Sequence, residues 1–214
     1  MRDASENSSP DPRVVFFDRL AADWDTAEQD PAETVRQLAA CADLLKLRPG
    51  EDVVEVGCGT GQLTGWLAGQ VRPGHVLGID FSPAMIAKAR AKNIPAEFRV
   101  ADVCQDELGE NLFEVAFCFH SFPHFRDQAA ALGNIAAALK PVGRLLVVHL
   151  NSRAEVNRFH DSVGGEVAGD HLPDDTRWEE LLAGAGLRKI EQIDREGLFL
   201  LKVGLSRQAP LEDT

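Results

Sequence analysis

The stretch Val53-Val54-Glu55-Val56-Gly57-Cys58-Gly59-Thr60-Gly61 decides the fold, because it joins a buried strand to a helix through a glycine-rich turn. An apolar run of β-branched residues is typical of a strand buried on both faces. The three glycines stand at alternate positions, so no Cβ keeps the backbone away from a ligand. Residues 62–68 should then begin a helix whose free N–H groups face the same ligand. The stretch therefore predicts a ligand site, although a similar turn also opens dinucleotide-binding domains.

Two further segments of the same kind follow along the chain. The apolar run 76–80 ends in Asp80, where a carboxylate accepts hydrogen bonds from the hydroxyls of a ribose. Ser82 and Pro83 predict the N-cap and the first residue of a helix. A third strand is expected over 98–103, and it carries a second acid, Asp102. Strands that alternate with helices in this order predict a parallel sheet with right-handed crossovers.

These segments together resemble the class I S-adenosylmethionine-dependent methyltransferases, of the small-molecule, ubiquinone-methyltransferase-like group. The third glycine of the turn comes one residue earlier than in the nicotinamide-binding pattern G-x-G-x-x-G. The resemblance implies an α/β fold, namely a Rossmann-like doubly wound sheet of seven strands in a single domain. The sheet would be mostly parallel, with an antiparallel C-terminal strand and helices on both faces. S-adenosyl-L-methionine is the cofactor that the resemblance implies.

The resemblance also implies which residues hold the cofactor. The glycine-rich turn would hold the methionine part, and Asp80 would hold the ribose. The pair Asp102-Val103 would bind the adenine, and Met85 would pack against the face of the adenine ring. The full set of cofactor residues is Glu55, Gly57, Gly59, Gly61, Asp80, Phe81, Met85, Asp102 and Val103.

The chain divides into a disordered tail over 1–12, two N-terminal helices over 13–47, a methyltransferase domain over 48–206 and a tail over 207–214. The first helix should run over 14–25, with Phe16 or Phe17, Leu20 and Trp24 on one apolar stripe. One interpretation is a helix packed on the core. The other is a lid over the cofactor, because many small-molecule methyltransferases carry a similar F-D-x-x-A-x-x-W-D segment. The second helix is expected over 31–47.

The rest of the domain should complete the sheet. Strands are expected over 113–119 and 144–150, and an antiparallel pair over 187–194 and 198–204. A helix is expected over 127–139, and another over 178–185. The segment 151–175 breaks the pattern and reads as an insertion with a short helix over 154–161.

Composition excludes several classes of partner. A formal net charge of -12 over 214 residues argues against a nucleic-acid partner, because neutralising phosphates needs clustered Lys and Arg. The sequence has no apolar run of transmembrane length and no signal peptide, so we expect no membrane partner. Its four cysteines are far apart, which suits a reducing cytoplasm. The chain has no tyrosine, so proton transfer falls to His, Asp, Glu or Cys.

Histidines gather where ligands bind in such a sheet, beyond the carboxyl ends of the strands. Five of the six follow the fourth or fifth strand or lie in the insertion. We predict His120, His124 and His149 as catalytic residues, with His120 or His124 as the base or the substrate-orienting group. The alternative is that each histidine only satisfies a local hydrogen bond. Substrate contacts are predicted for Trp24, Arg153 and His160, the arginine for an acidic group.

No metal site is predicted. His120 and His124 have the spacing of helical ligands, but Pro123 between them suggests a helix start, and an imidazole-bound metal stays an alternative. The predicted function is methyl transfer to a small-molecule acceptor by in-line displacement. The alternatives are carbon methylation of a quinone-like or polyketide-like substrate and a regulatory protein that binds S-adenosylmethionine without catalysis. The sequence leaves the acceptor atom open.

Overall fold

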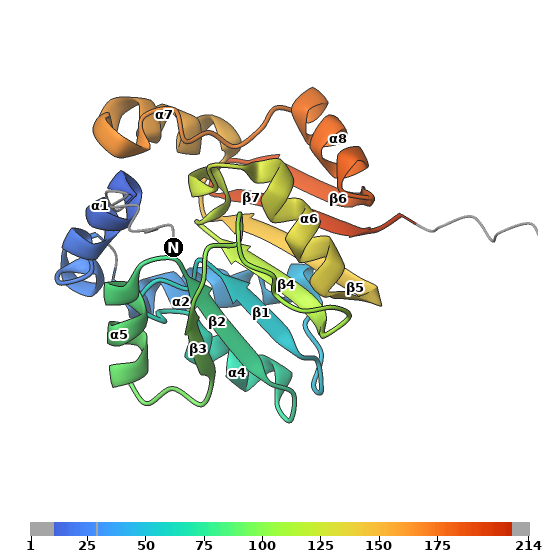
Figure 1. Ribbon diagram of the computed structural model, residues 1–214, viewed down its shortest axis with the longest axis horizontal. Helices are drawn as coiled ribbons and strands as arrows, with labels where there is room; N and C mark the ends of the chain where they lie inside the picture. Colours follow the sequence, from blue (N-terminus) through green and yellow to red (C-terminus); the bar gives the residue numbers. More distant parts are fainter. Residues whose placement is uncertain (1–10, 29, 207–214) are drawn as a thin grey trace, which may run out of the picture.

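A seven-stranded sheet forms the centre of the molecule in a computed structural model that describes residues 11–28 and 30–206 (Figure 1). The strand order is β3-β2-β1-β4-β5-β7-β6. The strands are β1 Val53–Val56, β2 Val76–Asp80, β3 Glu97–Val100, β4 Phe113–Phe119, β5 Leu139–His149, β6 Leu187–Arg195 and β7 Leu198–Leu205. β7 pairs antiparallel with both of its neighbours, and the other pairs are parallel. The predicted fold class is therefore confirmed.

Helices cover both faces of the sheet (Figure 1). They are α1 Pro12–Leu20, α2 Pro31–Ala40, α3 Ala42–Leu45, α4 Thr64–Val71, α5 Pro83–Ala91, α6 Gln128–Ala138, α7 Arg153–Val163 and α8 Asp175–Gly184. Short helical turns span Trp24–Glu28 (a π-helix), Phe122–His124 and Gly165–Val167 (both 3-10). Within the described residues, no helix is both long and apolar enough to cross a bilayer.

The sheet separates two large apolar cores, and its central strand β4 contributes side chains to both. Val115 and Phe117 pack with side chains of α2, α3 and α4 on one face. Ala116 and Cys118 pack with α6 and α8 on the other, where Trp178 is wholly buried. Alternation along a strand sends neighbouring side chains to opposite faces, so β4 is apolar over 115–118, where both of its faces are covered.

The strand order reverses between β1 and β4, and this reversal positions the site. β1 pairs with β2 on one side and with β4 on the other. The crossovers after these two strands therefore leave toward opposite faces and open a crevice beyond the carboxyl ends of the strands. In Figure 1 the helix α1 lies across this end of the sheet, beside α5 and α7.

The N-terminal helices differ from the prediction in their bounds. α1 begins at Pro12, inside the segment predicted to be a disordered tail, because Asp11 caps it by accepting a hydrogen bond from the backbone N–H of Arg13 (2.9 Å). The helix ends at Leu20, and Trp24 begins a separate π-helix. The second predicted helix breaks at Cys41 into α2 and α3. The remaining tail predictions, for 1–10 and 207–214, lie outside the described residues.

The bounds of two strands also differ from the prediction. β5 begins at Leu139, earlier than the predicted 144. An ion pair between Lys140 and Glu114 of β4 (2.6 Å) holds this early part of β5 against β4, and the register of the β4–β5 pairing shifts there. β3 ends at Val100, so Asp102 lies in the turn after the strand. The insertion contains the longer helix α7, whose first turn closes a capping box between Ser152 and Glu155.

Candidate functional site

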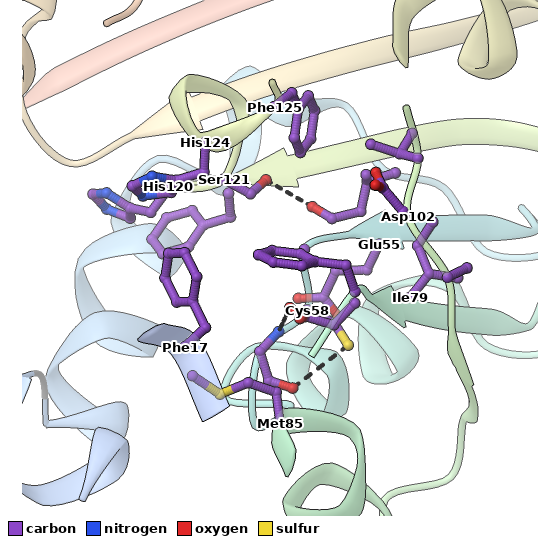
Figure 2. Close-up of a pocket in the computed structure, with 18 of the residues that line it drawn as sticks. Phe17, Glu55, Cys58, Ile79, Met85, Asp102, His120, Ser121, His124 and Phe125 are labelled. Carbon is purple, nitrogen blue, oxygen red and sulfur yellow. Dashed lines mark hydrogen bonds between the residues drawn. The ribbon is translucent and has the colours of Figure 1, made fainter. Parts of the chain in front are cut away.

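A cavity lies beyond the carboxyl ends of β1, β2 and β4, beneath α1 (Figure 2). Its empty volume is about 1020 Å³, part of which is open to solvent. Figure 2 shows His120, Ser121, His124 and Phe125 on the segment after β4, with Phe17 of α1 below the two histidines. The predicted site residues that line the cavity are Trp24, Glu55, Gly57, Gly59, Asp80, Phe81, Met85, Asp102, Val103, His120 and His124.

The three glycines of the turn have different surroundings. A Cβ at Gly57 would lie 2.4 Å from the Cβ of Ser121, so this glycine lets the turn pack on the segment after β4. A Cβ at Gly59 would have only Trp24 nearby, at 3.8 Å, so this glycine faces the cavity. A Cβ at Gly61 would meet Ile94 at 3.0 Å. The structure thus places Gly61 in packing between the turn and its neighbours, away from the cavity lining.

Two buried carboxyl groups lie in the cavity wall. Asp80 accepts hydrogen bonds from the backbone N–H groups of Gly59 and Ser82, both at 2.9 Å, and burial raises its pKa to about 6. Glu55 accepts one hydrogen bond, from the Thr64 hydroxyl at 2.5 Å, and burial raises its pKa to about 8. Among the described residues neither carboxyl has an ion-pair partner. The wall therefore favours a ligand that brings positive charge.

Glu55 should make the stability of the free protein depend on pH. Its pKa of about 8 in the folded state lies above the ordinary value of 4.5, so the folded state binds more protons between these two values. The stabilisation is then complete below the lower value and is lost as the pH rises through the higher one. We expect the contribution of Glu55 to the free energy of unfolding to fall by a few kcal/mol between about pH 5 and pH 8, at about 1.4 kcal/mol per pH unit.

Urea unfolding across this pH range measures the slope. Glu55→Gln should remove the contribution of Glu55 to this slope, because the amide does not ionise. A matched control is Glu114→Gln, since Lys140 and the Asp52 N–H hold the pKa of this partly buried carboxyl below its ordinary value. The control should leave the slope above about pH 5 intact. An equal slope in wild type and Glu55→Gln would rule out Glu55 as its source.

His120 occupies a backbone conformation that few side chains adopt. Its φ is 52°, in the left-handed region, where histidine is one of the tolerated residues. The backbone N–H of Leu150 donates to its Nε2 at 3.2 Å, so Nδ1 carries the ring proton. Burial, helped by the nearby His124 and His160, lowers its pKa to about 4. His120 is therefore a neutral hydrogen-bond donor at neutral pH and a weak base.

His124 is held by a carboxylate that sequence analysis did not select. Its Nδ1 lies 2.7 Å from Oδ2 of Asp170, whose side chain is only 4% exposed. A carboxylate only accepts, so Nδ1 donates and Nε2 is left as an acceptor. Arg13 of α1 binds the other oxygen of Asp170. The neighbouring His171 instead pairs with the exposed Asp161 at 2.7 Å.

Besides Gly61, three of the predicted catalytic and substrate residues do not line the cavity. His149 lies behind His120, with ring centroids 4.9 Å apart, and burial lowers its pKa well below the ordinary value. Its two ring nitrogens have no hydrogen-bond partner among the described residues. His160 packs on His124 at 4.9 Å. Arg153 binds Asp175 (2.7 Å) and Asp194 (3.4 Å), away from the cavity lining.

Residues 11–28, which we call the cover, contact the segments that follow β1, β2 and α5. Ser82 and Thr60 donate from their hydroxyls to Asp18 (2.5 Å) and Asp25 (2.6 Å) of the cover. Lys92 pairs with Asp25 at 2.7 Å. Phe17 packs edge-on against the Phe81 ring at 5.5 Å. The cover thus contacts the glycine-rich turn, the end of β2 and α5.

The cover should respond to the cofactor. Because its contacts surround the cavity, a ligand beneath it adds contacts and slows its opening. We expect hydrogen exchange in residues 13–28 to slow when S-adenosylmethionine is added, while exchange in α8, which does not line the cavity, stays the same. Equal protection of the cover with and without the ligand would support a static packing helix.

A resident metal ion finds no site in the described part of the chain. No three His, Cys, Asp or Glu side chains there are arranged so that they could hold a metal ion.

Comparisons with known proteins bear on this cavity. A family model described as a methyltransferase domain matches residues 53–143. Phosphoethanolamine N-methyltransferase 1 of Triticum aestivum is 30% identical over 162 residues, which cover 74% of this chain and 32% of the wheat protein. O-methyltransferase cnsE of Penicillium expansum is 34% identical over 136 residues, covering 60% of this chain and 49% of the fungal protein. The solved structure of a DhpI–SAH complex has a TM-score of 0.68 at 20% identity, covering 91% of this chain and 96% of that one.

These matches differ in what they support. The family match contains the glycine-rich turn, β2 and the segment after β4. The likeness to the DhpI complex, at its low identity, shows the fold alone. The chain spans less than half the length of the two curated relatives named above. Neither relative is a ubiquinone methyltransferase, so that subgroup stays a prediction.

Proposed function

We propose that this chain, whose domain belongs to the class I S-adenosylmethionine-dependent methyltransferases, methylates a small molecule at an oxygen or nitrogen that carries a proton. The observation that carries the proposal is His124, held at the cavity by the buried Asp170. The two relatives support oxygen and nitrogen acceptors, since one is named an O-methyltransferase and the other an N-methyltransferase. The free cysteines suit the reducing cytoplasm that we propose as its location.

The residues of the cavity fit S-adenosylmethionine. Gly59 leaves room for close approach, and the unpaired carboxyls of Glu55 and Asp80 suit a positively charged ligand. We propose that the turn holds the methionine part, Asp80 the ribose, and Asp102-Val103 the adenine. When bound, this cofactor supplies the methyl group together with its own leaving group.

His124 is proposed as the base. Its donated Nδ1 hydrogen bond fixes the ring and leaves Nε2 able to accept the proton of an acceptor O–H or N–H. Asp170 stabilises the imidazolium that forms, as an orienting carboxylate does for a catalytic histidine. An acceptor that loses its proton as it attacks avoids building positive charge in a cavity closed by the cover.

His120 is proposed as a group that orients the acceptor. Its Nε2 is taken up by the Leu150 N–H and its pKa is lowered to about 4 by burial, so it serves poorly as a base. Its Nδ1–H is left to donate to a lone pair of the acceptor. In this proposal His124 is the base and His120 orients the acceptor, whereas the sequence left open which histidine has which role.

A transfer assay with a labelled methyl group tests the proposal. The panel should contain phosphoethanolamine, phenols, amines, thiols and a quinol, each with purified protein and S-adenosylmethionine. We expect labelled product from an amine or a hydroxyl compound. Label only on a quinol ring carbon would favour carbon methylation. Tight cofactor binding with no turnover on any acceptor would favour a regulatory protein.

A further inference from the structure

Arg13 of the cover reaches the segment that carries His124. One guanidinium nitrogen donates to the backbone carbonyl of His124 at 2.7 Å. Another donates to Oδ1 of Asp170, whose Oδ2 holds Nδ1 of His124. The Arg13 side chain is 20% exposed and that of Asp170 only 4%. A residue 111 positions before His124 in the chain thus contacts both the histidine and its carboxylate partner.

We propose that Arg13 is a positioning residue, which fixes His124 and Asp170 in their working arrangement when the cover docks on the cavity. The inference rests on the proposed function, because it assumes that His124 acts on the acceptor. It adds a link between the cover and the base, so that docking of α1 also assembles the pair of His124 and Asp170, which we call the dyad.

The geometry of arginine explains the link. A guanidinium presents several donors in a rigid fork, so binding two acceptors fixes their relative position. Each oxygen of Asp170 has its own partner, Arg13 on one side and His124 on the other. Without Arg13 a buried carboxylate would lose its charge partner and could turn away from the ring. The Nδ1 proton of His124 would then lose its acceptor, and the tautomer with Nε2 free would no longer be selected.

Other contacts of the cover provide a matched control. Asp18, also on α1, accepts from Ser82 and from the backbone N–H of Ala84 (3.2 Å), and it touches neither His124 nor Asp170. Asp18→Ala should therefore loosen the cover without disturbing the dyad. Arg13→Gln removes the charge next to Asp170, and Arg13→Lys keeps the charge without the fork.

Kinetics with an acceptor from the panel form the first part of the test. We expect Arg13→Gln to lower kcat by about tenfold or more, as expected for loss of a charge-assisted hydrogen bond. Cofactor affinity should stay nearly unchanged, and Arg13→Lys should restore part of kcat. Asp18→Ala should speed exchange in the cover and raise KM, with kcat at saturation kept. Equal losses of kcat in Arg13→Gln and Asp18→Ala would show that Arg13 only holds the cover down.

Nitrogen-15 NMR of the imidazole rings forms the second part and needs no acceptor. The His124 signals are assigned by their loss in His124→Gln. We expect one tautomer, protonated at Nδ1, in the wild type and in Asp18→Ala, and a mixture in Arg13→Gln. A single tautomer in Arg13→Gln would overturn the inference. Failure of every acceptor in the panel would count against the proposed function, whereas the NMR result would still decide the role of Arg13.

Discussion

Replacing His124 by glutamine is expected to lower kcat by about 10² to 10⁴, the contribution of a positioned general base. Glutamine keeps a polar group of similar length but cannot take up the acceptor's proton. Because His124 is proposed to act in the reaction and not in holding the cofactor, affinity for S-adenosylmethionine should hardly change. Asp170→Asn should lower kcat in the same direction, since an amide next to Nδ1 no longer selects the tautomer.

His171→Gln is the matched control for this prediction. His171 also bonds a carboxylate, Asp161, but both side chains are largely exposed and neither lines the cavity beneath the cover. Its kcat should equal that of the wild type. A kcat for His124→Gln within about twofold of wild type would remove His124 from the mechanism, because it falls far below the effect of losing a base.

Gly59→Val is expected to abolish binding of S-adenosylmethionine while the protein stays folded. The added side chain would project into the cavity, where only Trp24 lies near the Cβ, at 3.8 Å. Calorimetry should find no heat of binding, and circular dichroism should find a wild-type fold. Part of any effect comes from backbone strain, because Gly59 has a φ of 53°.

Gly197→Val separates strain from the loss of space. Gly197 has a φ of 72° and nothing within 4 Å of an added Cβ, and it lies in the turn between β6 and β7, outside the cavity lining. This variant carries similar strain and should bind the cofactor normally. A folded Gly59→Val that binds as tightly as the wild type would place the cofactor elsewhere.

The parts of the fold that sequence predicted well depend on local signals. β1, β2 and β4 follow from apolar runs of fixed length, and the N-cap of α5 follows from Ser82, which accepts from the backbone N–H of Met85 at 3.1 Å. The glycine-rich turn follows from three residues whose φ values are all positive. Each of these features is decided by residues within a few positions of one another, so a single sequence reveals them.

The missed parts depend on contacts between distant residues. Asp170 partners His124 across 46 positions, and Arg13 reaches Asp170 across 157. Asp170 and His171 are adjacent in the sequence, but the structure gives these two residues different partners. The only signal for the dyad was the enrichment of histidines around one predicted edge of the sheet. Arg153 was selected by position alone, and its two acidic partners lie on α8 and β6.

The helix breaks were missed for a related reason. The apolar stripe through Phe17 and Trp24 has helical spacing, so a continuous helix was predicted. The structure ends α1 at Leu20 and continues in a π-helix, which allows Asp25 to reach Thr60 and Lys92. Contacts with the glycine-rich turn, and not the local spacing, decide where the helix ends.

The central claim is that the cavity beneath the cover holds S-adenosylmethionine with its reactive end toward His124. A crystal structure of the protein with S-adenosylhomocysteine tests it most directly. We expect the adenine beside Asp102 and Met85, the ribose hydroxyls on Asp80, and the sulfur facing the His124 ring across the space left for an acceptor. A ligand bound outside this cavity, or one whose sulfur faces away from His124, would contradict the account.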